Sequence, residues 1–288
     1  MIKIMTDLSA DVPKDVAEKL GIAVLPFYIN AEERSILAGE DYTPQMFYDE
    51  FGEADEMPST SQATPEILEN MYRDCGKDNQ IIHITIPANG SGIVNTARMV
   101  SAQLIEDEGF DITVADSSMY SYGIGANVVA AAEMARDGAT KAYTVLAFLK
   151  ERFENDKVYF IVDDLKFLQK GGRIKATTMV ISKVLDIKPI LYSNDGLVEA
   201  FAKVRGIKKA IAKMVDLTEE KIDDAENATV YVMHANAPER AEITAKMIEE
   251  RIHPAKIVFC EVGPVITCHA GPGVFGVYFR HKKQEKNG

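Results

Sequence analysis

A single histidine near the C-terminus, His269, has the setting that most suggests chemistry. It lies in the segment 263–273, between two Gly/Pro turns and just before the apolar run 274–279. Glycine reaches backbone conformations closed to other residues, and proline holds turns rigid, so we expect an imidazole fixed in a loop. No Asp or Glu lies close in sequence to orient it. The pattern favours a hydrogen-bond donor to a buried anion over a catalytic dyad.

The same segment contains a literal match to G-x-G-x-x-G, from Gly271 to Gly276. The dinucleotide-binding form of this motif follows a strand and opens a helix, whereas here a β-rich run follows. Pro272 also removes a backbone donor that a phosphate would need. We therefore reject a nucleotide site at these glycines.

Polar groups also follow three strands expected in the first half, at Asp7, Ser91 and Asp116. Ligands of parallel α/β sheets bind at the carboxyl ends of the strands, so we expect these groups to converge. Each has a structural interpretation too. Ser91 can cap the next helix and bind an anion at once, because helix N-termini favour anions. For the two aspartates we favour caps.

Alternating strand and helix patterns must position these groups in the first half. Thr64 and Pro65 together predict a helix start, as an N-cap and a first helical residue. Strands are expected at 2–5, 23–29, 81–86 and 112–115, and helices at 13–20, 44–51, 65–75, 93–106, 124–136 and 140–153. This βαβ rhythm predicts a three-layer domain with a parallel sheet.

The second half has a different pattern, in which Asn194-Asp195-Gly196 marks a β-hairpin. Strands are expected at 158–162, 187–192, 197–204, 229–234, 257–261 and 274–280, and helices at 207–215 and 239–251. The prediction is an α/β protein of two domains. Residues 1–156 form an N-terminal parallel-sheet domain, and residues 157–288 form a C-terminal mixed-sheet domain that contains His269.

Composition excludes several classes of protein. The chain has 288 residues, of which 47% are hydrophobic, and no run of about 18 apolar residues that would insert stably into a membrane. Its net charge of −12 argues against nucleic-acid binding. The three cysteines have no metal-ligand spacing, so we expect no metal site and free thiols in a reducing cytoplasm.

The charge is distributed unevenly along the chain. Residues 1–57 contain 4 basic and 13 acidic residues, whereas residues 166–213 contain 11 basic and 3 acidic residues. The basic segment is interpreted either as solvated helix faces or as a docking surface for an acidic or phosphate-bearing partner. Charge alone favours solvated faces slightly.

Short motifs recur along the chain at 6–11, 58–62, 91–92, 116–117, 163–168, 170–174, 203–206 and the His269 segment. Taken in order, these motifs resemble those of the DegV family of bacterial fatty acid-binding proteins, over essentially the whole length. The chain departs from the family pattern at Leu8 and Pro87-Ala88, where relatives have hydroxyl residues, which removes possible donors near the head group.

The resemblance implies a two-domain α/β carrier that buries one long-chain fatty acid, with the carboxylate between the domains. The family motif places Thr60, Ser91 and His269 at that carboxylate. Without the resemblance, we would interpret Thr60 as a turn residue before the following helix. Possible supporting residues around the carboxylate are Ser61, Gly92 and Arg205, and for Arg205 a surface role is equally expected.

The resemblance also implies a partner, a separate ATP-dependent fatty acid kinase that converts the bound acid to an acyl phosphate for phospholipid synthesis. The carrier would have no catalytic centre and no cofactor of its own. Lys170 and Arg173, in a basic Gly-Gly loop, would contact the kinase.

The main alternative is an enzyme that hydrolyses acyl substrates with a Ser/Asp/His site. Against it, the chain has no G-x-S-x-G elbow. It also has no G-x-x-x-x-G-K-[ST] loop that would support kinase chemistry of its own.

Overall fold

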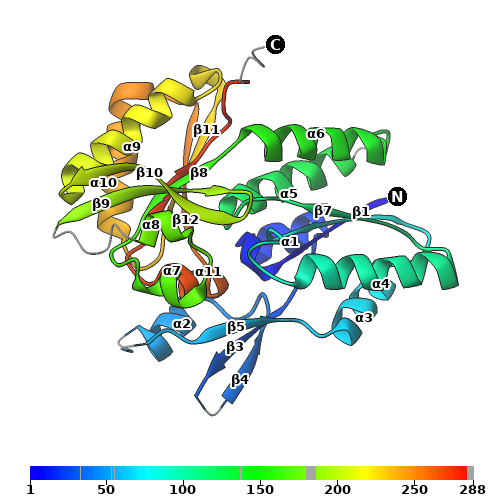
Figure 1. Cartoon of the computed structure of the whole chain (residues 1–288). Helices are drawn as coiled ribbons and strands as arrows, with labels where there is room; N and C mark the ends of the chain where they lie inside the picture. The colour runs from blue at the N-terminus through cyan, green and yellow to red at the C-terminus, as the bar shows by residue number, and fades with distance from the viewer. Residues whose placement is uncertain (33, 53, 55, 137, 180–185, 284–288) are drawn as a thin grey trace.

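The computed structural model describes residues 1–32, 34–52, 54, 56–136, 138–179 and 186–283. It is an α/β structure with a four-stranded sheet, a six-stranded sheet and a small three-stranded sheet (Figure 1). Within the described residues, no helix is long and apolar enough to cross a membrane.

The first half is built on a wholly parallel sheet in the order β2-β1-β6-β7. Strand β1 lies inside the sheet, and its last four residues are buried, as expected for a strand covered on both faces. The strands of this sheet are β1 (Ile2–Asp7), β2 (Ala23–Leu25), β6 (Gln80–Thr85) and β7 (Asp111–Asp116). The parallel sheet predicted from the sequence is therefore confirmed.

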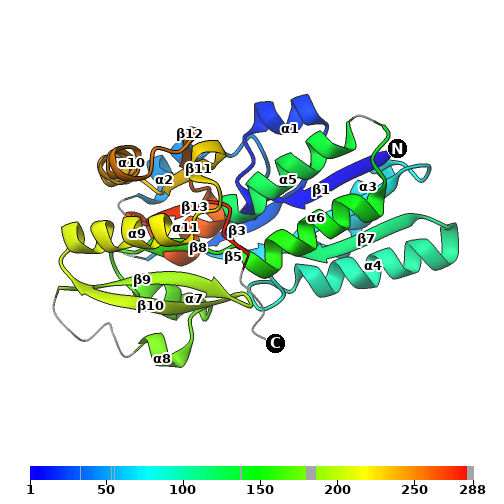
Figure 2. The ribbon, with the colours of Figure 1, turned by 90° about the horizontal axis from the view of Figure 1, so that it is seen from above.

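Helices cover both faces of this sheet (Figures 1 and 2). Helices α5 and α6 pack on β1 and β6, with α1 against α5, while α3 and α4 pack on the opposite face against β2 and β7. The hydroxyl of Thr64 accepts a hydrogen bond from the Ile67 amide, so the predicted cap of α3 is confirmed. The helices are α1 (Lys14–Leu20), α3 (Pro65–Cys75), α4 (Ile93–Glu108), α5 (Tyr122–Ala135) and α6 (Ala142–Asn155).

The single strand expected at 23–29 is wrong, because the chain changes sheets at Pro26. Proline has no N–H to donate to a ladder, so β2 ends before it. The next strand, β3, joins a separate antiparallel sheet in the order β4-β3-β5, which the sequence interpretation missed. Its elements are β3 (Phe27–Ala31), β4 (Arg34–Ala38) and β5 (Ser59–Gln62), with the expected helix α2 (Pro44–Phe51) between β4 and β5.

The second half contains the mixed sheet, in the order β10-β9-β8-β13-β11-β12. The predicted hairpin is confirmed, since Asp195 and Gly196 have φ angles of 49° and 75° in the tight turn between β9 and β10. The strands are β8 (Val158–Ile161), β9 (Ile187–Asn194), β10 (Leu197–Arg205), β11 (Thr229–His234), β12 (Lys256–Glu261) and β13 (Phe275–Tyr278).

Two long helices, α9 and α10, pack against each other and against strands of the mixed sheet. Of three short helices, α7 and α11 pack against each other and α11 contacts β5 of the three-stranded sheet, whereas α8 packs on β10 (Figures 1 and 2). The helices of this half are α7 (Lys166–Gly171), α8 (Ala176–Met179), α9 (Ile207–Lys221), α10 (Pro238–Ile252) and α11 (Pro264–Ala270).

The segment around His269 differs from the expected loop, because most of it is the helix α11. Gly263 caps this helix and Pro264 is its first residue, where a missing N–H costs nothing. Gly271, with φ of 79°, follows its end. The glycines and prolines therefore bound a helical turn, and His269 is fixed by helix geometry.

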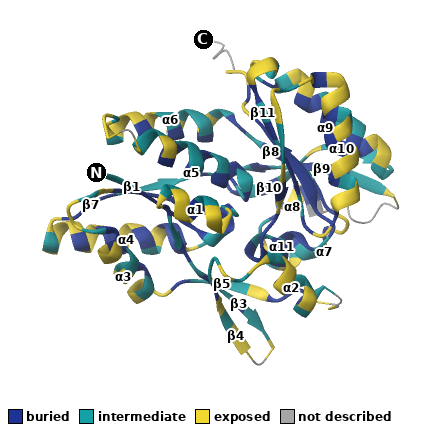
Figure 3. Cartoon of the chain, turned by 180° about the vertical axis from the view of Figure 1, so that it is seen from behind, coloured by how far each residue is buried: buried dark blue, intermediate teal, exposed yellow. Residues whose placement is uncertain are grey.

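The two halves share apolar packing. One buried cluster includes Ile84 from the first half and Met233 from the second, while a separate cluster lies beneath α9 and α10. Figure 3 shows the buried residues concentrated along the sheets and on the inner faces of the helices. The domain boundary near residue 156 falls between α6 and β8, and the division into two domains stays a prediction.

Candidate functional site

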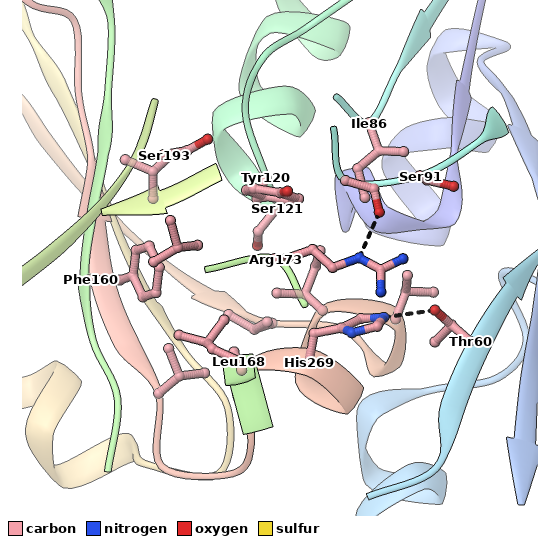
Figure 4. Close-up of a pocket in the computed structure, with 18 of the residues that line it drawn as sticks. Thr60, Ile86, Ser91, Tyr120, Ser121, Phe160, Leu168, Arg173, Ser193 and His269 are labelled. Carbon is pink, nitrogen blue, oxygen red and sulfur yellow. Dashed lines mark hydrogen bonds between the residues drawn. The ribbon is translucent and has the colours of Figure 1, made fainter. Parts of the chain in front are cut away.

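A cavity of about 260 Å³ lies between the two halves (Figure 4). Its wall combines residues from the three-stranded sheet, the six-stranded sheet, the segments after β6 and β7, and the short helices α7 and α11, and most of it is apolar. Representative apolar lining residues are Phe27, Ile86, Phe160, Leu168, Met233 and Phe275. A space of this composition suits a hydrocarbon, and the polar groups at one end determine what else it accepts.

Four polar side chains from distant parts of the chain line one end of this cavity. Thr60 comes from β5, Ser91 from the turn after β6, Arg173 from the segment after α7, and His269 from α11. The Oγ1 of Thr60 and the Nε2 of His269 are 2.8 Å apart and hydrogen-bonded. The three residues assigned to the carboxylate from the sequence therefore line one cavity, together with an arginine.

The imidazole of His269 is held neutral. Burial, and secondarily the positive charge of Arg173, lower the pKa of His269 to about 4. Its Nδ1 lies so close to the backbone of Gly171 that a Cβ added there would approach to 2.6 Å. Near pH 7 the ring is therefore an uncharged hydrogen-bonding group in a fixed position.

Arg173 is half-buried and lines the cavity, whereas the sequence interpretation had placed it on a surface for a partner protein. Its Nε donates to the carbonyl of Gly90 at 3.0 Å, and Nη1 donates to the carbonyl of Gly171. In Figure 4 the guanidinium points toward the Thr60–His269 pair. Within the described chain it forms no ion pair with a carboxylate, so its charge is available to an anion.

Lys170 and Arg205 are both exposed and neither lines the cavity. Lys170 lies in the last turn of α7 and forms an ion pair of 2.5 Å with Glu56 of the first half. Arg205 is the last residue of β10. The supporting role considered for Arg205 is therefore not seen, and a role of Lys170 in binding a partner stays a prediction.

Ser91 lies directly before Gly92, the N-cap residue of α4, and lines the cavity. Its Oγ accepts a hydrogen bond of 3.3 Å from the Ile93 amide at the start of α4, which leaves the hydroxyl proton free to donate. Ser61 and Gly92, which the sequence interpretation considered as supporting residues around the carboxylate, also line the cavity. The hydroxyl of Ser61 accepts a hydrogen bond of 3.1 Å from Asn30.

The two aspartates at strand ends fix backbone turns, as expected. Asp7 is buried and accepts from the amides of Ser9 and Ile86, at 3.1 and 2.8 Å. Asp116 accepts from the amides of Ala88 and Ser118, at 3.1 and 2.9 Å. Neither lines the cavity. Their carboxylates shape the loops that surround the polar end.

The positions that depart from the family pattern also lie outside the cavity lining. Leu8 packs beside two of the apolar clusters. Pro87 faces the tip of the β9–β10 hairpin, where a Cβ on Gly196 would come within 2.6 Å of the proline Cβ. These residues contribute packing around the site.

The side chains do not form the relay that acyl hydrolysis needs. His269 pairs with Thr60, and among the described residues no carboxylate accepts a hydrogen bond from its ring. Burial raises the pKa of the neighbouring Cys268 thiol to about 12, so a reactive thiolate is disfavoured. Within the described part of the chain, no group of three His, Cys, Asp or Glu side chains is arranged to hold a metal ion.

Sequence reasoning missed two contributions to the site. Arg173 belongs at the polar end, and Tyr120 and Ser121 contribute to the wall from the loop before α5. The sequence shows a glycine pair directly before Arg173, but nothing in it indicates that this arginine lies near His269. Its position results from contacts between segments far apart in the chain.

The comparisons with known proteins agree with this geometry. A family model described as "Uncharacterised protein, DegV family" matches residues 1–282. Protein DegV of Bacillus subtilis is 30% identical over 282 residues, which cover 96% of this chain and 98% of that protein. A DegV domain-containing protein of Listeria innocua, lin2658, is 32% identical over 281 residues, which cover 96% of this chain and 97% of the relative.

Solved structures are similar over nearly the whole chain. A DegV family protein from Thermus thermophilus, described with fatty acid binding, superposes with a TM-score of 0.87 at 28% identity and covers 98% of this chain and 99% of its own. Bacillus subtilis DegV, described as a fatty acid binding protein, gives a TM-score of 0.84 at 29% identity with the same coverage. The chain therefore belongs to the DegV family.

Proposed function

We propose that this protein binds one long-chain fatty acid, with the carboxylate at the polar end of the cavity and the acyl chain along its apolar wall. The observation that carries this proposal is the guanidinium of Arg173, which forms no ion pair within the described residues, beside three neutral hydrogen-bonding groups in a mostly apolar cavity. The DegV proteins of Thermus thermophilus and Bacillus subtilis, both described as fatty acid binding, support it.

The chemistry of a fatty acid matches both parts of the cavity. Each buried methylene contributes about 0.8 kcal/mol, so roughly 14 methylenes give on the order of 11 kcal/mol before costs. Burying a carboxylate without partners costs several kcal/mol. Charge-assisted hydrogen bonds from Arg173, Thr60 and Ser91 offset that cost, because an ionised acceptor makes stronger hydrogen bonds than a neutral one.

The bound carboxylate determines the direction of the hydrogen bond between Thr60 and His269. A carboxylate only accepts hydrogen bonds, so the Thr60 hydroxyl donates its proton to the ligand. The same hydroxyl oxygen then accepts the Nε2–H of neutral His269, at the observed separation of 2.8 Å. In this arrangement His269 orients Thr60 and strengthens it as a donor.

The finer part of the proposal is that the protein presents its fatty acid to a separate ATP-dependent kinase, which forms the acyl phosphate. Phosphorylation of a carboxylate requires ATP phosphates to be held beside it, and the sequence has no P-loop to hold them. The carrier thus supplies the bound acid and the partner supplies the catalysis. Exposed Lys170 is a candidate contact with that partner. The free buried thiols of Cys75, Cys260 and Cys268 fit a reducing cytoplasm.

Mass spectrometry of the extract from denatured protein tests the proposal directly. We expect roughly one fatty acid per chain, and we expect stripped protein to bind labelled palmitate or oleate. A folded protein that neither contains nor binds a fatty acid would refute the proposal. Turnover of generic esters by the same preparation would instead support the hydrolase alternative.

A further inference from the structure

Asp11 lies half-buried where the first half of the chain meets helix α11. The residue follows the 3-10 helix η1 (Leu8–Ala10) in a left-handed conformation, with φ of 53°. Its Oδ2 accepts a hydrogen bond of 2.5 Å from the hydroxyl of Ser121. Its Oδ1 is buried without a full hydrogen bond, and a Cβ on Gly263 would come within 2.4 Å of it. One carboxyl therefore contacts the residue before α5 and the residue before α11.

Both contacts lead directly to the cavity. Ser121 lines the cavity and is only 4% exposed (Figure 4). Its φ of 52° and ψ of −132° are unusual for a residue other than glycine, so its neighbours must hold it there. On the other side, Gly263 begins the seven-residue helix in which His269 lies. A movement at Asp11 would shift two walls of the same cavity.

We propose that Asp11 is a positioning residue for the fatty acid site, whose carboxyl holds Ser121 and the start of α11 together so that His269 reaches Thr60. This inference rests on the proposed function, because it concerns the same cavity. It adds that closure of the cavity depends on the protonation state of the Asp11 carboxyl.

The surroundings of Asp11 oppose a negative charge. Burial raises the pKa of Asp11 to about 7, and the Ser121 hydroxyl and the Gly263 amide offset the effect only in part. Near neutral pH, the closed protein is therefore a mixture of protonated and ionised Asp11. Protonation removes the charge while the contacts with Ser121 and Gly263 remain.

Among the described residues, none of the titratable groups that face Asp11 is a cation. They are Asp7 on β1, Tyr48 on α2, Tyr122 on α5 and Cys260 on β12. Burial raises the pKa of Tyr48, Tyr122 and Cys260, so these three stay neutral near pH 7. The negative charge of Asp7 raises the pKa of Asp11 further.

The linkage between proton binding and opening gives the direction in which pH changes fatty acid release. When the halves separate, water reaches Asp11 and its pKa falls toward the ordinary value of 3.8. Opening then releases a proton, so it becomes more favourable as pH rises through the window between that value and about 7. Each unit of difference in pKa between closed and open states changes the equilibrium by about tenfold. Fatty acid release should therefore accelerate with pH.

The rate of fatty acid release tests this inference. Labelled oleate is chased with excess unlabelled oleate between about pH 5 and pH 8.5, in the wild type and in Asp11→Asn. We expect the wild-type rate to rise about tenfold or more. Asp11→Asn should keep the slow, low-pH rate throughout. Because both proteins share the titration of oleate, an equal rise in both, or fast release from Asp11→Asn at every pH, would overturn the inference.

Two further variants should shift, in opposite directions, the pH at which the release rate is halfway between its low-pH and high-pH values. Ser121→Ala should raise it, because the serine hydrogen bond lowers the pKa of Asp11. Asp7→Asn should lower it, because a neighbouring like charge is removed. If Asp11→Asn does not fold, these two variants test the role of Asp11 instead. An unchanged midpoint of the pH dependence in both would overturn the inference.

Urea unfolding of protein stripped of ligand separates this inference from the proposed function. The free energy of unfolding of the wild type should fall between pH 5 and pH 8 more steeply than that of Asp11→Asn. A protein that binds no fatty acid yet shows this contrast refutes the proposed function and supports the role of Asp11. A protein that binds fatty acid with no contrast in release or unfolding refutes the role of Asp11 alone.

Discussion

Replacement of Arg173 by methionine tests the arrangement of the polar end most directly. Methionine keeps much of the length and apolar volume of arginine but removes the charge and every donor. The guanidinium is held by the carbonyls of Gly90 and Gly171 and has no carboxylate partner among the described residues, so its loss strands no internal charge. Binding should therefore change much more than folding.

The magnitude follows from the interaction that is lost. A hydrogen bond to a charged group contributes about 1.5–3 kcal/mol. Removing one such contact to the carboxylate should weaken binding about 10- to 150-fold, since about 1.4 kcal/mol corresponds to tenfold. The charge of Arg173 also lowers the pKa of His269. In the variant the pKa of His269 should therefore rise above about 4.

Two assays on the same samples follow these effects. Displacement of a fluorescent fatty acid gives the affinity for oleate, and an NMR titration of the imidazole gives the pKa of His269. Arg205→Met is the matched control, because Arg205 is exposed and does not line the cavity. Unchanged affinity in Arg173→Met, or an equal loss in Arg205→Met, would refute the proposed position of the carboxylate.

Three other predictions concern neighbouring residues. Thr60→Val should weaken oleate binding by about 1–3 kcal/mol while the urea midpoint changes less, and equal affinity by displacement would mean that this hydroxyl does not contact the ligand. Gly171→Ala should displace the imidazole of His269, whose Nδ1 would lie 2.6 Å from the new Cβ, so binding should fall and the NMR signals of the imidazole should shift; Gly39→Ala, with open space around it, is the control. Lys170→Ala should leave oleate affinity intact and slow acyl phosphate formation by the partner kinase, more so at high salt, and a normal rate at all salt concentrations would exclude this contact.

Local physics made much of the fold predictable from the sequence. Apolar runs of strand length alternate with helical patterns in the first half, and that alternation requires parallel strands. Turn and cap chemistry is equally local. Thr64 caps α3, and Asp195-Gly196 forms the hairpin, because each depends only on residues next to it in the chain.

The sequence-based predictions that were wrong or incomplete also have physical causes. Pro26 ends one strand, but whether the following residues join the same sheet depends on partners elsewhere in the chain. Strand β5 consists of Ser59–Gln62, which has no apolar alternation, and it is a strand because β3 supplies its hydrogen bonds. The Gly/Pro-rich segment at 263–273 resembled a loop because its helix is only seven residues long.

The sequence by itself determined the alternation of strands and helices in the first half, the likeness to the DegV family, and Thr60, Ser91 and His269 as candidates for one site. Only the tertiary structure showed that Arg173 turns inward to these residues and that Asp11 contacts the start of α11. The reason is that both arrangements join groups distant in sequence, whose hydrogen bonds, burial and shifted pKa values exist only once the two halves pack together.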